Sequence, residues 1–440
     1  MAEGRVTRTR RAALETLARV RAGDLADRAF DHAASALEPR DRAWTQELVY
    51  GTFRLRGRID HLLGALVKGG VEKLDPDVLD VLRLGAYQLL EMGSVPPYAA
   101  VSQSVELARA AGAGRAAGLV NGVLQNLQRR RASLRFPDPA RDPAGHVAAW
   151  GSHPRWLAER WVLRWGAEGA RALAEANNAR PELFLRPLGL SVEDAIARLR
   201  EAGIEAEPVP LSPDSLRVLP PATAAEALAA LPAVVQDPAA ALVVRYAAVP
   251  EGATVLDVAA APGGKALGMA ERAAHVAAAD LSARRIARVA ENAGRVGWPH
   301  RVGPVVADSR FPPFREGSGD LVLLDAPCTG TGTFRRHPDG RWRVGPGDLD
   351  ALVALQRELM GAAAALVRPG GWLVYSTCSL EPEENERQVE DFLARHPEFE
   401  PGPAEGAVDP ALVDGAGRLC VLPQRHGFDG AFAARLRRRA

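Results

Sequence analysis

Residues 253–265 read ATVLDVAAAPGGK, an apolar run that passes directly into small residues, two glycines and a lysine. Four more apolar runs follow: HVAAAD (275–280), PVVAD (304–308), DLVLLDAP (320–327) and GGWLVYSTCSL (370–380). Because these runs are continuous rather than alternating, they predict strands buried on both faces, and the stretches between them are long enough for crossover helices. The pattern predicts a parallel sheet flanked by helices, which binds ligands beyond the carboxyl ends of its strands.

The composition limits the class of protein that carries this sheet. A chain of 440 residues suggests two or three domains of about 150 residues each. With 47% hydrophobic and 25% charged residues it is typical of a soluble globular protein, and no apolar run reaches the roughly 18 residues of a membrane helix. Three cysteines without a CxxC pair favour a reducing cytoplasm and argue against a disulfide framework and a zinc site. We therefore expect a cytoplasmic protein without a metal.

Three regions follow from the patterning. Residues 1–132 have helical spacing throughout, as in the stripe of apolar residues at 119, 120, 123, 124 and 127, and predict an all-α bundle. A proline-rich linker at 133–146 precedes a second region, 147–235, in which short extended pieces flank a helix opened by a capping box at Ser191. Residues 236–440 contain the predicted sheet. The expected protein is therefore multidomain: an α-helical bundle, a small α/β domain and an α/β domain with a Rossmann-like sheet.

Several polar groups stand where the predicted strands end. The first strand leads into a flexible turn that lets the backbone approach a ligand closely, and the turn consists of Ala259, Ala260, Ala261, Pro262, Gly263, Gly264 and Lys265. Its spacing differs from a phosphate-binding GxxxxGK[ST] loop. Asp280 ends the second strand, where an acid commonly accepts hydrogen bonds from ribose hydroxyls, and Asp308 ends the third, near the place of an adenine amino group. A nucleoside-like cofactor fits these positions better than a phosphate-rich one.

Two of the three cysteines stand at the ends of the remaining strands. The fourth run ends in Asp325-Ala326-Pro327-Cys328 and the fifth in Thr377-Cys378. A buried cysteine is most often an inert small hydrophobe. If the five strands lie in one sheet, however, both thiols and Asp325 converge on the edge that faces the ligand crevice, which predicts a working site.

Basic stretches and tryptophans are the candidate contacts to nucleic acid. The net charge is only +1, so any such contact depends on local patches, for example FRLRGR at 53–58 and RRHPDGRWR at 335–343. The second patch follows the Cys328 loop, so its arginines either grip phosphates at the mouth of the site or form an ordinary surface turn. Four of the eight tryptophans lie in WGSHPRWLAERWVLRWG at 150–166, where aromatic packing is favoured over base stacking. Pro382-Glu383-Glu384 is interpreted as the acidic first turn of a helix.

At these residues the chain resembles a known family. AAAPGGK, DAPCTGTG with the following RRHPD, and YSTCSLEPEENE are similar to the motifs of S-adenosylmethionine-dependent RNA cytosine-5 methyltransferases, and the domain order resembles that of the RsmB-type enzymes, which begin with a NusB-like RNA-binding bundle. The resemblance covers nearly the full length. It implies S-adenosylmethionine as cofactor, bound by residues 259–265 with Asp280, Asp308 and Asp325. It also implies Cys378 as the nucleophile, Cys328 as a helper thiol and Asp325 as a contact to the target base.

The implied reaction is methylation of carbon 5 of a cytosine in RNA, most simply small-subunit ribosomal RNA in an unstacked or single-stranded form, by a monomer. A thiolate that adds to carbon 6 makes carbon 5 nucleophilic enough to take a methyl group. A transfer RNA or another RNA is an alternative substrate. Methylation of a base amino group is a rival activity, but its [D/N]PP[Y/F] pattern is replaced here by DAPC. A third possibility is a non-catalytic RNA-binding scaffold, which the two cysteines and Asp325 argue against.

Overall fold

The computed structural model describes residues 6–440. They form two compact units: one contains the chain up to Ala179 together with Phe334–Arg343, and the other contains Arg180–Thr333 together with Val344–Ala440. The domain boundaries predicted at residues 132, 147 and 235 stay predictions. In the structure, residues 147–179 are helical and belong to the first unit, and the second unit contains both the small and the large sheet. None of the helices formed by residues 6–440 combines the length and the hydropathy needed to span a bilayer.

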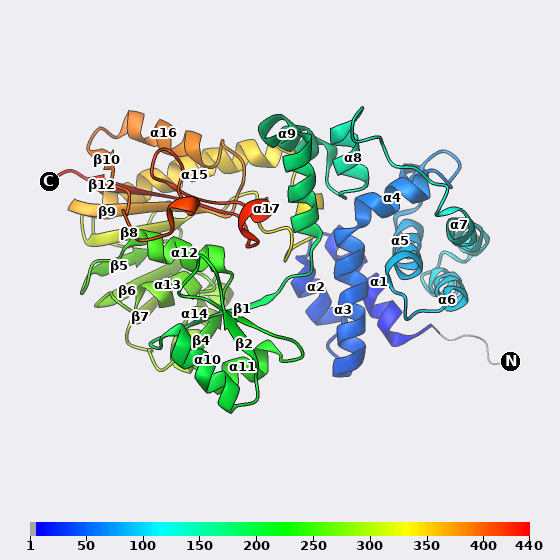
Figure 1. Cartoon of the computed structure of the whole chain (residues 1–440), viewed down its shortest axis with the longest axis horizontal. Helices are drawn as coiled ribbons and strands as arrows, with labels where there is room; N and C mark the ends of the chain where they lie inside the picture. Colours follow the sequence, from blue (N-terminus) through cyan, green and yellow to red (C-terminus); the bar gives the residue numbers. More distant parts are fainter. Residues whose placement is uncertain (1–5) are drawn as a thin grey trace. The chain divides into compact units, whose positions relative to one another are not determined.

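The first unit is α-helical, which confirms the helical structure predicted for residues 1–132 over the part that the structure describes (Figure 1). Its core is built by helices whose buried stripes face one another, and Asp75 caps one of them by accepting a hydrogen bond from the backbone N–H of Asp77. The apolar stripe at 119, 120, 123, 124 and 127 lies on one helix, where Leu119 is 41% exposed and the other four side chains are buried. The helices are α1 (Arg8–Arg21), α2 (Ala26–Ala33), α3 (Pro39–Arg54), α4 (Arg56–Gly64), α5 (Pro76–Glu91), α6 (Pro97–Ala110), α7 (Ala117–Arg130), α8 (Pro143–Ala149) and α9 (Arg155–Asn178), with 3-10 turns at Val71–Lys73, Gly114–Ala116 and Gly340–Trp342.

Trp161 supports the packing interpretation of the tryptophan-rich stretch. It is 1% exposed and lies on α9, with its ring edge-on to His153 at 5.0 Å between centroids. The ring of Phe334, from the segment Phe334–Arg343, lies 6.4 Å away. A buried tryptophan of this kind anchors helices to one another and is not available to stack on a base.

The second unit begins with a small antiparallel sheet of order β2-β3-β1-β4. Its strands are β1 (Leu183–Pro187), β2 (Ala206–Pro208), β3 (Leu216–Val218) and β4 (Ala233–Val235), covered by α10 (Val192–Glu201) and α11 (Ala224–Ala230). Of the capping box predicted at Ser191, the N-cap half is confirmed, because the Ser191 hydroxyl accepts a hydrogen bond from the N–H of Asp194. The sheet and its helices share a small apolar core of their own.

The large sheet has the order β10-β12-β9-β8-β5-β6-β7, with β11 paired to β12, and β5 to β9 are mutually parallel as predicted. From β5 the chain runs outward through β6 to β7 and then returns to β8 on the other side of β5. The carboxyl ends of β5 and β8 therefore border the crevice in which such sheets bind ligands. The strands are β5 (Thr254–Asp257), β6 (His275–Asp280), β7 (Val302–Val306), β8 (Gly319–Asp325), β9 (Val367–Thr377), β10 (Phe399–Pro401), β11 (Leu419–Val421) and β12 (Ala431–Arg438).

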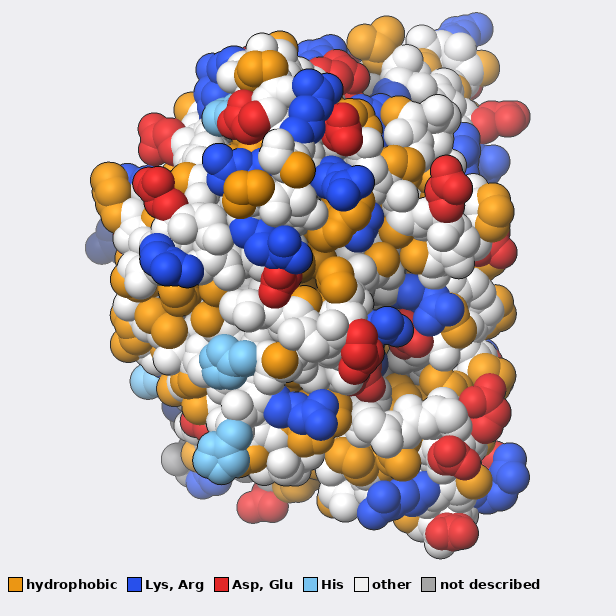
Figure 2. Space-filling model, turned by 90° about the vertical axis from the view of Figure 1, so that its left-hand side faces the viewer, with side chains coloured by type: hydrophobic (Ala, Val, Ile, Leu, Met, Phe, Trp, Pro, Cys, Tyr) orange, Lys and Arg blue, Asp and Glu red, His pale blue; other side chains and the backbone are white. Residues whose placement is uncertain are grey.

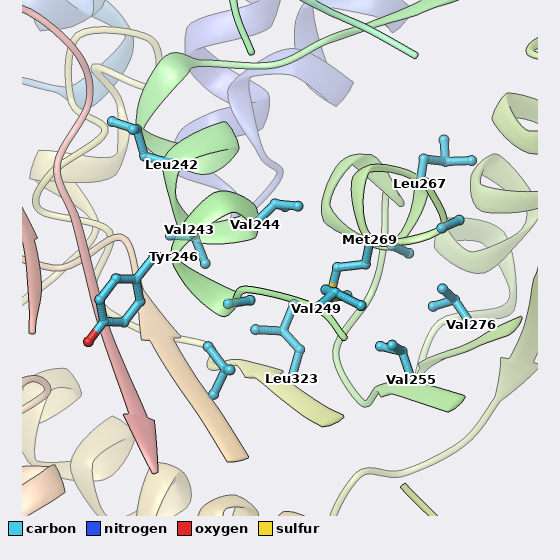
Figure 3. Packing of buried hydrophobic residues seen from close by; sticks show 14 of the residues in the cluster. Leu242, Val243, Val244, Tyr246, Val249, Val255, Leu267, Met269, Val276 and Leu323 are labelled. Atoms are coloured by element: carbon cyan, nitrogen blue, oxygen red, sulfur yellow. The ribbon is translucent and has the colours of Figure 1, made fainter. Parts of the chain in front are cut away.

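Helices cover both faces of this sheet because its central strands are apolar on both sides. Along β8, Leu321 and Leu323 point into one core while Val322 and Leu324 point into the other. The first core is closed by α12 (Pro238–Ala247), α13 (Gly264–Met269) and α14 (Ala283–Arg295), and Figure 3 shows side chains of α12 and α13 packed over the strands. The second is closed by α15 (Pro346–Leu366) and α16 (Glu386–Arg395); α17 (Pro423–His426) and a 3-10 turn at Pro410–Leu412 complete the unit.

The surface agrees with the near-zero net charge. Figure 2 shows one end of the molecule, where basic and acidic side chains are interspersed among apolar and neutral ones. An RNA contact on that face would depend on individual side chains rather than on one broad basic field.

Candidate active site

The two strand-end thiols meet. Sγ of Cys328 lies 3.4 Å from Sγ of Cys378, because β8 and β9 are parallel neighbours with Asp325 opposite Ser376 in the register. This separation is far longer than a disulfide bond of about 2.05 Å and is short enough for a hydrogen bond between the sulfur atoms. Both cysteines are free and half-buried. The convergence predicted from the strand order is therefore present.

The surroundings of Cys328 favour the protonated form of its thiol. Its hydrogen bond to Cys378, then its burial, then the negative charges of Cys378 and Glu384 raise the pKa of the Cys328 thiol well above its ordinary value. Cys328 is therefore a weaker acid than an ordinary cysteine, and either sulfur atom can be the donor in the hydrogen bond between the two. A thiolate is the reactive form of cysteine, so the raised pKa makes Cys328 a poor nucleophile.

Asp325 lies beside the thiols and is held by two donors. Its Oδ1 accepts a hydrogen bond of 2.8 Å from the Ser376 hydroxyl, and its Oδ2 accepts one of 2.6 Å from Nζ of Lys265. Burial alone would lower the pKa of Lys265, but the negative charges of Asp325, Cys378 and Asp257 outweigh it and raise this pKa. Lys265 is therefore a fixed positive charge that stabilises negative charge on the thiol pair.

The turn after β5 is shaped for a ligand. Gly263 has φ +103°, a conformation that favours glycine, and a Cβ there would lie 3.1 Å from both methyl carbons of Val289. Two buried acceptors beside the turn, Oδ2 of Asp257 and Oε1 of Gln236, have no hydrogen-bond partner among the described residues. Orphaned acceptors are costly unless a ligand supplies the donor. The ammonium and hydroxyl groups of a nucleoside-bearing amino acid fit this need.

The two remaining predicted acids lie in the same row of strand ends. Asp280 ends β6 and is 5% exposed; it accepts hydrogen bonds of 2.9 Å from the N–H of Ser282 and 2.6 Å from Arg285. Asp308 follows β7, and its side-chain and backbone hydrogen bonds from Arg310 lower the pKa of its carboxyl. Both arginine side chains are about half exposed and can leave the carboxylates when hydroxyl or amino groups of a ligand arrive.

Sequence reasoning missed Glu384. It was assigned to the first turn of a helix, but α16 starts only at Glu386, and Glu384 is 0% exposed beneath the Cys328 loop. Its carboxylate accepts hydrogen bonds from the N–H and hydroxyl of Thr329 and from Nε2 of Gln356. Burial raises the pKa of the Glu384 carboxyl, and the hydrogen bonds, which lower this pKa, offset the effect only in part. The only signal in the sequence was its position six residues after Cys378.

A pair of glycines also escaped notice. The N–H of Gly332 donates to the carbonyl oxygen of Cys378 at 2.9 Å, and the N–H of Gly430 donates to the carbonyl oxygen of Gly332 at 2.7 Å. A Cβ on Gly332 would lie 2.6 Å from Cα of Gly430, so side chains are excluded. This backbone ladder fixes the Cys328 loop, Cys378 and the segment before β12 in one arrangement.

The basic stretch at 335–343 is partly structural. Arg341 is 0% exposed inside the helical unit and donates to the carbonyl oxygens of Arg54, Ser152 and Asn177. The expectation that the arginines of this stretch grip phosphates is therefore wrong for Arg341. Among residues 6–440, no group of three or more His, Cys, Asp or Glu side chains is placed to hold a metal ion.

Comparison with known proteins matches each region. Residues 246–437 match the family described as 16S rRNA methyltransferase RsmB/F, residues 7–129 the NusB family, and residues 153–224 the ferredoxin-like domain of RsmF/B-like methyltransferases. The chain is 35% identical to ribosomal RNA small subunit methyltransferase B of Cronobacter sakazakii, over 90% of each chain. The chain belongs to the RsmB/F family. It also shares 38% identity with a putative methyltransferase of Mycobacterium tuberculosis, over 98% of this chain and 96% of the relative.

Solved structures agree with the RsmB/F assignment. The crystal structure of PH0851 superposes with a TM-score of 0.79 at 28% identity and covers 98% of each chain. A methyltransferase homologue from Pyrococcus horikoshii has a TM-score of 0.55 at 26% identity, over 68% of this chain and 99% of the other. The chain thus has the architecture of this family: a NusB-type bundle, a ferredoxin-like sheet and a Rossmann-like sheet. Its cofactor is S-adenosylmethionine, which the residues at the strand ends fit.

Proposed function

We propose that this RsmB/F methyltransferase methylates carbon 5 of a cytosine in small-subunit ribosomal RNA through a covalent bond between Sγ of Cys378 and carbon 6. The observation that carries the proposal is the pair of sulfur atoms 3.4 Å apart beside Asp325. Neither methylation of an amino group nor a scaffold role needs two thiols in contact at the ligand edge of the sheet.

Bound S-adenosylmethionine supplies a methyl group on a sulfonium. Residues 259–265 with Asp257, Asp280 and Asp308 would hold it, since they provide the small-residue turn and the acceptors described above. Lys265 keeps positive charge close to Cys378. The protein thereby stabilises the thiolate before the base enters, which is the condition for its attack.

The steps on the base follow from the positions of the side chains. The Cys378 thiolate adds to carbon 6, and the electron pair of the C5–C6 double bond becomes available at carbon 5, which takes the methyl group. Asp325 stabilises the proton that N3 gains during the attack. The carbon 5 proton then leaves to solvent water, the electron pair of that C–H bond re-forms the C5–C6 double bond, and the S–C6 bond breaks with its electron pair on Sγ of Cys378. Cys328 lies 3.4 Å from the departing sulfur and assists this release.

The substrate has to expose the face of its base. Carbon 6 is inaccessible in a stacked helix, so the target cytosine must be unstacked or flipped. Single-stranded or looped RNA meets this requirement. Transfer RNA would meet it too, and bisulfite sequencing of RNA from cells with and without the gene separates the substrates: loss of a protected cytosine only in transfer RNA would contradict the ribosomal assignment.

Cysteine variants test the chemistry. With labelled S-adenosylmethionine and small-subunit ribosomal RNA, Cys378→Ala should transfer no methyl group. Cys328→Ala should accumulate an RNA–protein adduct that survives a denaturing gel. Cys420→Ala, which removes the third cysteine on β11, is the matched control and should behave as the unaltered protein. Full activity of Cys378→Ala would refute the covalent mechanism, and an inactive unaltered protein that still binds RNA would favour the scaffold.

A further inference from the structure

A cavity lined by both charged and apolar side chains lies in the helical unit. Its volume is about 390 Å³, within the roughly 300–1,000 Å³ of small-molecule sites. Four arginines line it, together with two aspartates: Arg21, Arg56, Arg83, Arg343, Asp80 and Asp339. The two basic stretches noted in the sequence, 53–58 and 335–343, therefore meet here although about 280 residues separate them.

Two of the four arginines are fully engaged with acids. Arg21 pairs with Asp77 and Asp80. Arg83 pairs with Asp60 at 2.8 Å and with Asp80 at 3.0 Å. These ion pairs build the wall of the cavity and leave little positive charge for a ligand.

Arg56 is different. Its closest carboxylate, Asp60, is 3.6 Å away and already takes two hydrogen bonds from Arg83. Nε of Arg56 is buried and has no hydrogen-bond partner among the described residues. Burial first, and then the positive charge of Arg83, lower the pKa of Arg56. This guanidinium is therefore a cation whose charge the protein compensates only in part.

The guanidinium of Arg56 is nevertheless held in place. Its central carbon lies 5.2 Å from the centre of the Trp342 ring, and the indole N–H of Trp342 donates to the carbonyl oxygen of Phe53 at 2.7 Å. A stacked, planar guanidinium is pre-organised for a bidentate contact with phosphate oxygens. Arg343 adds a second cation at the rim, with a loose contact of 3.5 Å to Asp339.

We propose that this cavity binds a phosphate group of the RNA substrate between Arg56 and Arg343. The inference rests on the proposed function only in taking RNA as the substrate. A phosphate supplies the additional negative charge that Arg56 lacks and an oxygen acceptor for its Nε. Free inorganic phosphate or a mononucleotide offers the same chemistry, so the experiment has to separate the two sources.

The test measures RNA affinity rather than methylation. Full-length protein with Cys378→Ala serves as the background, so a failure of the covalent mechanism leaves the measurement unchanged. Filter binding to transcribed small-subunit ribosomal RNA over a range of salt concentrations should show that Arg56→Gln weakens binding about tenfold and reduces the salt slope by about one. Arg343→Gln should act in the same direction, and Arg56→Lys should restore part of the slope.

Controls make each outcome decisive. Arg109→Gln removes an exposed arginine of the same unit, on α6, that pairs with Glu106 outside the cavity. An equal loss of affinity in Arg109→Gln would overturn the proposal, as would unchanged binding by an Arg56→Gln protein that melts at the normal temperature. Inorganic phosphate that raises the melting temperature of the background protein, but not that of Arg56→Gln, while RNA binding is unaffected by the substitution, would assign the cavity to free phosphate and refute the RNA source.

Discussion

Replacing Asp257 with asparagine should change how the stability of the sheet-containing unit depends on pH. Asp257 ends β5 beneath the turn at 259–265 and is 0% exposed. Burial first, and then the negative charge of Asp325, raise the pKa of its carboxyl from 3.8 to about 7, against the opposing charge of Lys265. The folded protein therefore keeps a proton on Asp257 at pH values where the unfolded chain has lost it.

The sign and the size of the effect follow by linkage. Because the folded state binds more protons than the unfolded state between pH 4 and pH 7, the stabilisation is complete below about pH 4 and is lost as the pH rises through about 7. At about 1.4 kcal/mol for each pKa unit, the loss between about pH 5 and pH 8 is about 2.5 kcal/mol. For a unit of this size that corresponds to about 5 °C in melting temperature.

Calorimetry of the cofactor-free protein between about pH 5 and pH 8 is the assay. The asparagine side chain in Asp257→Asn cannot titrate, so the melting temperature of this variant should increase relative to that of the unaltered protein as the pH rises. Asp308→Asn is the matched control, because its carboxyl has a lowered pKa and its removal should not flatten the pH dependence in this range. A constant offset between Asp257→Asn and the unaltered protein at every pH would refute the reasoning.

Three further predictions concern the supports of the site. Glu384→Gln places an amide N–H₂ against hydrogen-bond donors beneath the Cys328 loop, so it should cost about 1–3 kcal/mol in unfolding experiments and slow the release of the RNA adduct on a denaturing gel. Gly332→Ala would put a Cβ 2.7 Å from the carbonyl oxygen of the proposed nucleophile and should lower the methyl-transfer rate about a hundredfold, whereas Gly361→Ala, in open space on α15, should leave the rate unchanged. Arg341→Met leaves several buried carbonyl oxygens without a donor and should lower the unfolding free energy of the helical unit by about 3 kcal/mol, measured by urea titration followed by circular dichroism.

The sheet and its ligand edge could be predicted because they depend on local patterns. Continuous apolar runs such as 321–324 are explained only by strands buried on both faces, and a parallel sheet brings all the carboxyl ends to one edge. If the two strands belong to one parallel sheet, Cys328 and Cys378 must lie at the same edge of it, where the carboxyl ends of the strands meet. Their resemblance to a known family then supplied the roles that geometry alone leaves open.

The supports of the site could not be predicted, because they depend on contacts between segments far apart in the sequence. From the sequence, Glu384 is interpreted as an acid in the first turn of a helix. In the fold it accepts hydrogen bonds from Thr329, which precedes it by 55 residues in the chain. Gly332 and Gly430 look like ordinary turn residues until their backbones meet. Whether a charged or turn residue such as these is buried depends on partners from distant segments, and its local sequence pattern does not contain that information.

The sequence by itself determined the order of the domains, the parallel sheet and the edge at which its cysteines and acids end, because strand periodicity and residue type are local properties. Only the tertiary structure decided which charges are compensated. It buries Arg341 among carbonyl oxygens, leaves Nε of Arg56 without a hydrogen-bond partner among the described residues, and sets two sulfur atoms 3.4 Å apart. The cost of burying a charge depends on every group that packs around it, and those groups come from the whole chain.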